Sequence, residues 1–172
     1  MTLIRITILC TMLAASGCGV YRLGSTMDPD LGTIAIGTVA NETREPMLTS
    51  YFRNEVPAMF MRDGSLQVVN GSADCVLQAR ITGYNLRQIG EEETISNDED
   101  QRLNRTVIWG VDVNVEYEVL RADGTAYIPT TVATGKAEFS ELIDLEVVRK
   151  DGLRQAIYDA ADQIVTAVTN PW

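Results

Sequence analysis

The sequence predicts an α+β fold, with two helices packed on one face of a mixed, largely antiparallel four- to five-stranded sheet. Residues 105–120 alternate, with β-branched or aromatic residues at every odd position from Val107 to Val119 and mostly polar residues or glycine between them. This period of two predicts one long strand with a buried face and a solvent-exposed face. From Leu153 to Val168 apolar residues recur at every third or fourth position, which predicts a helix that covers the apolar face. A first helix between strands and a second helix at the end are typical of an α+β domain.

The first 17 residues have the form of a secretory signal. One early charge, Arg5, precedes an apolar run that is too short to cross a bilayer comfortably and that ends in small residues. The stretch 13–18, LAASGC, resembles the lipobox of bacterial lipoproteins, with Ala15 at the position where leucine is most frequent. This resemblance implies cleavage before Cys18 and covalent acyl chains, including palmitate, on the thiol and amine of Cys18. The alternative is an ordinary cleaved signal, with Cys18 a plain thiol or a disulfide partner.

The lipobox sets the predicted domain organisation and location. Residues 1–17 are expected to form the signal peptide, 18–32 the lipid anchor and tether, and 33–172 a single domain. Several acyl chains give stable membrane anchoring, because each buried methylene contributes roughly 0.8 kcal/mol. By resemblance to enteric sorting rules, Gly19 after the anchor favours the periplasmic face of the outer membrane over the inner membrane.

The first third of the domain predicts a strand, a helix and a second strand. Thr33–Val39 is a short run of strand-forming residues. Apolar residues at helical spacing from Leu48 to Phe60 predict a helix over about 46–62. Pro57 inside this helix predicts a kink or two shorter helices, because proline removes a backbone hydrogen bond. A short strand is expected at 66–69.

The remaining sequence predicts further strands before the closing helix. Residues 75–89 predict one strand, bent by a bulge at Gly83 where the apolar positions change phase. The acidic segment 90–104 has no periodicity, so we predict a mobile loop tip that joins two long antiparallel strands. The other elements are a hairpin turn at 122–125, a strand at 132–139 and the closing helix from about 151 to 170.

Cysteine usage leaves a single thiol in the domain. Cys10 lies in the expected signal peptide and Cys18 at the expected acylation site, so Cys75 has no disulfide partner within the chain. We predict that Cys75 is a small buried hydrophobic residue.

Composition and motifs argue against an enzyme. The chain has 24 acidic residues, 14 basic residues and no histidine, which is the usual general base near neutral pH and a common zinc ligand. It contains no phosphate-binding glycine loop, nucleophile elbow, zinc-protease motif or CxxC pair. The acidic residues from Glu91 to Asp100 lack the spacing of a calcium loop, and Asp112, Glu116 and Glu118 are expected to be solvated on the polar face of the long strand. No cofactor or metal is therefore expected, and the acidic charge argues against nucleic acid as a partner.

Most of the chain from Cys18 to Trp172 resembles the LptE family of outer-membrane lipopolysaccharide-assembly lipoproteins. The matching pieces, in order, are CGVYRLG at 18–24, the first strand, NETREP at 41–46, RDG at 62–64, AD at 73–74, the alternating central strand, and YDAADQIV at 158–165 with the terminal Trp172. The resemblance implies two helices on a sheet, docked in the lumen of a large outer-membrane β-barrel of the LptD type that inserts lipopolysaccharide into the outer leaflet. It also implies a protein that is not an enzyme but helps the barrel fold, plugs it and contacts lipopolysaccharide.

The resemblance points to basic residues as lipopolysaccharide contacts. Arg102 or Arg105, near the start of the central strand, and Lys150, before the last helix, occupy places comparable to the proposed ligand contacts of the family. Neighbouring Arg149 and Arg154 are expected to be surface charges. The formal net charge of −10 opposes binding of a phosphorylated glycolipid unless divalent ions or a local basic patch intervene.

A second function stays open at this point. Lipoproteins that regulate periplasmic envelope enzymes, such as activators of peptidoglycan synthases, also begin with an anchor, a strand and a turn of the NET type before a helix. A protein of this class would bind a soluble periplasmic enzyme instead of a barrel. The two functions differ in whether the protein stays with the membrane once its anchor is removed.

Overall fold

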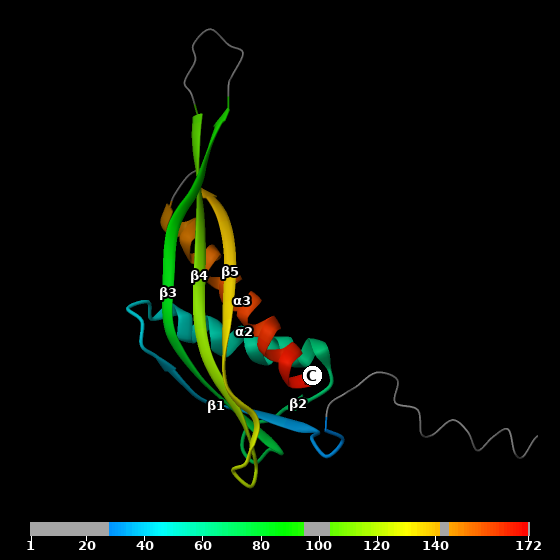
Figure 1. Ribbon diagram of the computed structural model, residues 1–172. Coiled ribbons are helices and arrows are strands. Elements are labelled where there is room, and N and C mark those ends of the chain that lie inside the picture. Colours follow the sequence, from blue (N-terminus) through cyan, green and yellow to red (C-terminus); the bar gives the residue numbers. More distant parts are fainter. Residues whose placement is uncertain (1–27, 95–103, 142–144, 172) are drawn as a thin grey trace, which may run out of the picture.

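The computed structural model describes residues 28–94, 104–141 and 145–171, which form five strands and two helices (Figure 1). In chain order the elements are β1 (Thr33–Asn41), α2 (Met47–Asp63), β2 (Gln67–Val68), β3 (Cys75–Thr94), β4 (Asn104–Arg121), β5 (Ala126–Glu141) and α3 (Leu145–Thr169). Both helices lie behind the sheet in Figure 1 and leave its other face uncovered. The predicted α+β class with two helices on one face of a sheet is confirmed.

The sheet has the strand order β2-β1-β3-β4-β5. β1 pairs in parallel with both β2 and β3, whereas β3 with β4 and β4 with β5 pair antiparallel. The sheet is therefore evenly mixed rather than largely antiparallel. The reason is connectivity: α2 carries the chain back along the sheet, so the next two strands, β2 and β3, run parallel to β1. The later neighbours β3–β4 and β4–β5 are consecutive strands that pair antiparallel. The predicted strand at 66–69 is reduced to the two residues of β2.

The central strand β4 has the predicted buried face along most of its length. Side chains at the odd positions from Val111 to Val119 are all buried, and those between them are exposed or half-buried. Val107 and Trp109, at the start of the same face, are only half-buried. The core therefore lies between α2, α3 and the part of β4 from Val111 onward.

β3 is longer than its apolar pattern predicted. The predicted strand ended at Ile89, but residues 90–94 continue β3 and pair with residues 104–108 of β4. The loop expected over 90–104 is thus wrong at both ends, and its middle, 95–103, lies outside the described residues. The ladder shifts register at Gly83, as predicted, and a second time at Gly90. Backbone hydrogen bonds between β3 and β4 form these ends of the ladder without needing apolar side chains. The sequence there therefore lacks the apolar–polar alternation from which a strand can be predicted.

α2 follows its prediction within one residue at each end. Its buried side chains are those expected from the helical spacing, from Leu48 to Phe60. Gly64 ends the helix in the left-handed conformation, with φ of 76°, and its N–H donates to the carbonyl of Phe60 at 2.9 Å. Pro57 lies inside a single continuous helix, so the alternative of two shorter helices is wrong.

α3 begins at Leu145, six residues before the start predicted from the apolar stripe. Glu146, Val147 and Lys150 in its first turns are exposed, so this part of the helix carries no stripe. Gly152 lies buried inside the helix. A Cβ at Gly152 would lie 2.4 Å from Cδ1 of Phe139, so the glycine makes room for the aromatic ring on β5.

The backbones of α3 and β5 meet directly at Gly135. A Cβ at this position would lie 1.9 Å from the carbonyl oxygen of Ala156 and 2.7 Å from the backbone nitrogen of Ala160. Glycine on the strand and alanines on the helix therefore allow an approach that larger side chains would prevent.

Side chains of α3 also bond the outer edge of β5. Gln163 accepts the Thr134 N–H through Oε1 at 3.3 Å and donates from Nε2 to the Thr134 carbonyl at 2.9 Å. Asp159 Oδ2 accepts the Lys136 N–H at 2.8 Å. These bonds occupy backbone groups that would otherwise be free on an edge strand.

The chain enters the domain beside the β4–β5 turn. Asp28 Oδ2 accepts a hydrogen bond from Arg121 Nη2 at 3.2 Å, and Leu31 is buried. Asp74, just before β3, accepts bonds from the N–H groups of Gly32 and Thr33 at 3.0 and 2.8 Å, and from the Thr33 hydroxyl at 2.7 Å. These three bonds, led by that of the hydroxyl, lower the pKa of the Asp74 carboxyl below its ordinary value. The start of β1 is therefore fixed at the β4–β5 turn end of the sheet.

Cys75 is free and fully buried at the start of β3, as predicted. Burial, and secondarily the negative charge of Asp74, raises the pKa of its thiol to about 11. We expect less than a few per cent of the Cys75 thiol to react with a maleimide at pH 7.5 in the folded variant with both Cys10→Ala and Cys18→Ala, because the thiolate is the reactive form. Mass spectrometry before and after denaturation measures the labelling. Rapid stoichiometric labelling of the folded protein would contradict the burial of Cys75.

Candidate functional site

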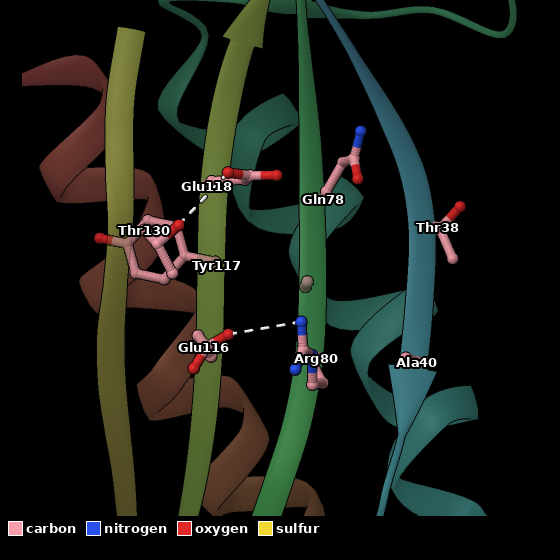
Figure 2. Close-up of a pocket in the computed structure, with 9 residues that line it drawn as sticks. Thr38, Ala40, Gln78, Arg80, Glu116, Tyr117, Glu118 and Thr130 are labelled. Atoms are coloured by element: carbon pink, nitrogen blue, oxygen red, sulfur yellow. Dashed lines mark hydrogen bonds and ion pairs between the residues drawn. The ribbon is translucent and has the colours of Figure 1, made fainter. Parts of the chain in front are cut away.

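The face of the sheet that no helix covers, here called the open face, carries a shallow hollow of about 340 Å³. Strands β1, β3, β4 and β5 all contribute to it because, in this part of the sheet, their even-numbered side chains point away from the helices (Figure 2). The polar side chains labelled in the hollow, apart from Tyr117, are Thr38, Gln78, Arg80, Glu116, Glu118 and Thr130.

The charges of the hollow are paired across strands. Arg80 lies 3.6 Å from Glu116 on β4 and 3.6 Å from Glu42 after β1. Thr130 donates to Glu118 Oε2 at 3.3 Å (Figure 2). These pairs are half exposed to water, so each contributes little to the free energy of unfolding.

The expectation that the carboxylates of β4 are simply solvated is therefore only partly correct. Asp112 is bonded to Arg87 of β3, and Glu116 lies in the ion pair with Arg80. The long strands place basic residues of β3 next to acidic residues of β4 in the ladder, which the spacing within one strand does not reveal. The open face is thus polar, and cross-strand ion pairs neutralise part of its charge.

A second hollow of about 390 Å³ lies between α2 and α3. Arg62 donates to the hydroxyl of Tyr158 at 2.6 Å, and Arg154 donates from Nε to Glu55 Oε1 at 2.8 Å. Each bond joins one helix to the other, so these residues fix the packing of the pair.

Lys150 is exposed in the second turn of α3 and has no ion pair among the described residues. Arg105 lies in β4, opposite Glu93 of β3, and Arg102 lies outside the described residues. Figure 1 shows the start of α3 and the extended ends of β3 and β4 at the same end of the molecule, opposite the β4–β5 turn. Lys150 and the backbone of Arg105 therefore lie toward the same end of the fold, although no described contact joins Lys150 to β4.

Arg149, expected to be a surface charge, is instead largely buried. Its Nη1 donates to Glu45 Oε2 at 2.6 Å and its Nη2 to Glu146 Oε2 at 3.0 Å. Glu45, in the turn before α2, is only 8% exposed. Bonds to Glu146 and Glu45 raise the pKa of the Arg149 guanidinium above its ordinary value. This pair joins the start of α3 to the β1–α2 turn, and no local sequence pattern marks it because its members are 104 residues apart.

Replacing Arg149 with alanine is expected to lower the free energy of unfolding by about 2–3 kcal/mol, because the buried Glu45 carboxylate loses its partner. Arg154→Ala is the matched control. Its guanidinium side chain is 62% exposed, so loss of the pair with Glu55 should cost less than about 1 kcal/mol. Urea unfolding of both variants measures the difference. Equal effects would mean that Arg149 behaves as a surface residue.

The described residues hold no cluster of three or more histidine, cysteine, aspartate or glutamate side chains that could bind a metal ion. Within the same residues, no helix has both the length and the apolar character needed to span a membrane.

Comparison with protein families matches residues 31–168 to LptE, described as lipopolysaccharide-assembly. Among solved structures, a minor lipoprotein from Acinetobacter baumannii is 14% identical, with 81% of this chain and 93% of that chain covered and a TM-score of 0.46. Lipoprotein B from Nitrosomonas europaea is 16% identical, with 81% and 83% covered and a TM-score of 0.46. With these low identities and TM-scores, the solved structures carry no argument about function, and the family assignment rests on the family match alone. A search of curated proteins finds no match.

Proposed function

Because this chain belongs to the LptE family of lipopolysaccharide-assembly proteins, we propose that it is an outer-membrane lipoprotein that binds and plugs a β-barrel of the LptD type. The family match over residues 31–168 carries this proposal, since it covers every described strand and nearly all of α3. The proposed role is assembly of lipopolysaccharide at the outer membrane, without catalysis.

The place where the chain enters the fold supports an orientation toward the membrane. The proposed acylation site, Cys18, precedes Asp28 by ten residues, which span at most about 35 Å. Asp28 is bonded to Arg121 at the β4–β5 turn, so acyl chains on Cys18 would keep this end near the membrane surface. β4 has 18 residues and reaches roughly 60 Å, so the end with Arg105 would extend away from the anchor.

Contact with lipopolysaccharide is proposed at that far end, through Lys150 with Arg102 or Arg105. Arg149 and Arg154 are engaged by Glu45 and Glu55, whereas Lys150 has no such partner in the described structure. A phosphate group can bind an unpaired cation without first breaking an ion pair within the protein, so an unpaired lysine is the favoured contact.

Separate substitution of each of the two lysines of the chain tests this contact. Lys150→Gln is expected to reduce photo-cross-linking of the purified protein to lipopolysaccharide several-fold. Lys136→Gln, which removes the other exposed lysine, should leave the cross-linking unchanged. Equal losses would show a non-specific charge effect.

A pull-down from detergent-solubilised envelopes tests the barrel partner. The tagged, anchored protein should recover a large β-barrel at near-equimolar amount, identified by mass spectrometry. The Cys18→Ala variant, exported by a cleavable signal peptide, should still sediment with membranes, because the barrel retains it without acyl chains. Recovery of a peptidoglycan synthase without a barrel would replace the proposal with the enzyme-regulator function.

A further inference from the structure

β3 has a free edge where β1 leaves the sheet. β1 pairs with β3 only as far as Ile81, whose carbonyl accepts the N–H of Glu42 at 2.9 Å. β3 then continues for 13 residues, and Figure 1 shows it extending past the point where the chain turns off toward α2. Among the described residues, no strand pairs with this part of β3 on the side away from β4.

The hydrogen-bond pattern identifies which backbone groups point outward. Thr134 of β5 uses its N–H and carbonyl for Gln163, so those groups face away from β4. Its partner Asn114 must then direct its own backbone groups toward Gly83 of β3, because backbone directions alternate between adjacent pairs of an antiparallel ladder. It follows that Gly83 bonds to β4 and that the N–H and carbonyl groups of Tyr84, and of every second residue after it, point to the free side.

A regular stretch of six residues, Gly83 to Gln88, lies between the two register shifts of β3. Tyr84, Leu86 and Gln88 are its outward-facing members and together offer six backbone donors and acceptors. Six residues match the usual length of a strand. The β5 edge differs, because Gln163 and Asp159 occupy its groups at Thr134 and Lys136.

A hollow of about 470 Å³ lies on this edge, lined by residues 42–44 and 82–86. The hollow lies beside β3 just past the end of β1, in the place that β1 would occupy if it continued along β3. Tyr84 is 36% exposed and Leu86 is half-buried, and both share the face of buried Val113 and Val111. Arg44 in the same hollow is exposed and has no ion pair in the described part of the chain.

We propose that the β3 edge from Gly83 to Gln88 binds an extended segment of the barrel partner by strand addition. The segment would carry apolar side chains at alternate positions, beside Tyr84 and Leu86, and an acidic side chain near Arg44. Backbone bonds supply affinity in this mode, and the alternating side chains supply specificity. This inference rests on the proposed function for the identity of the partner, while the site itself rests on the register, the hollow and the exposed residues.

Hydrogen exchange of the purified complex with the barrel tests the backbone bonds. Amides of Tyr84, Leu86 and Gln88 should exchange quickly in the free protein and at least tenfold more slowly in the complex. Amides of Gly83, Asn85 and Arg87, which face β4, should be protected in both states. Unchanged exchange at Tyr84 and Leu86 in a stable complex would overturn strand addition and leave the proposed function intact.

Cross-linking and substitution give an independent test in cells. A photo-reactive residue at position 84 should cross-link to the barrel, whereas one at exposed Val132 of the β5 edge should not. Tyr84→Lys should reduce barrel recovery at least tenfold, with Val132→Lys as the matched control and thermal unfolding as the check on folding. Cross-linking of position 84 to a second copy of this chain would overturn the proposed occupant. Failure of every variant and of the parent protein to recover a barrel would overturn both the proposed function and this inference.

Discussion

Gly135→Ala is expected to lower the free energy of unfolding by about 3 kcal/mol or more, although it adds a single methyl group. The added Cβ would lie 1.9 Å from the carbonyl oxygen of Ala156, a distance that no rotation of a side chain relieves. Either α3 moves away from β5, which opens the core, or the strand shifts and breaks its pairing with Val113. Overpacking of this kind commonly costs about 1–3 kcal/mol, and a backbone obstacle places this site at the upper end. Urea unfolding followed by circular dichroism measures the change.

Gly83→Ala is the matched control for Gly135→Ala. Gly83 also lies in a strand of the same sheet, but a Cβ there would meet no atom within 4 Å. Its φ is not in the left-handed region, so alanine should change the free energy of unfolding by less than about 1 kcal/mol, in either direction. Similar destabilisation by both substitutions would mean that glycine flexibility, and not the α3–β5 contact, determines the effect at Gly135.

The elements that could be predicted from the sequence are those with one buried and one exposed side, because such elements have a periodic apolar pattern. The core face of β4 and the stripe of α3 repeat at two and at 3.6 residues, since each packs one side against the other layer. Where this packing ends, the pattern ends as well. Residues 90–94 of β3 are held by backbone pairing, and the first turns of α3 carry exposed residues such as Glu146, Val147 and Lys150, so apolar periodicity did not reveal either segment.

The candidate sites were predictable to a smaller extent. Lys150 is exposed as expected, but the ionic role of Arg149 required knowledge of Glu45, 104 residues away, and of the burial of both. The free edge of β3 likewise depends on where β1 leaves the sheet, which is a property of the topology and not of β3 alone. Long-range pairing of this kind leaves no signal in the local composition of either partner.

Val113→Asp is expected to reduce the free energy of unfolding by about 4 kcal/mol or more. Val113 is fully buried on the helix face of β4, opposite Gly135 and therefore under α3. A carboxylate there would lose its hydration without gaining a partner, and the valine would also lose its own packing. This loss is a large fraction of the 5–15 kcal/mol that stabilises an ordinary domain. Thermal unfolding should shift by many degrees or lose its cooperative transition.

Asn114→Asp places the same carboxylate one residue along β4, on the open face. Asn114 is exposed, and its side-chain oxygen accepts the hydroxyl of Thr134 at 2.9 Å, a bond that aspartate retains. Only mild repulsion from Asp112 and Glu116 on the same face is added, so the cost should stay below about 1 kcal/mol. The contrast between adjacent positions tests the assignment of the two faces directly. If Val113→Asp were as well tolerated as Asn114→Asp, the helices would not cover the odd-numbered face of β4, and the core would have to be reassigned.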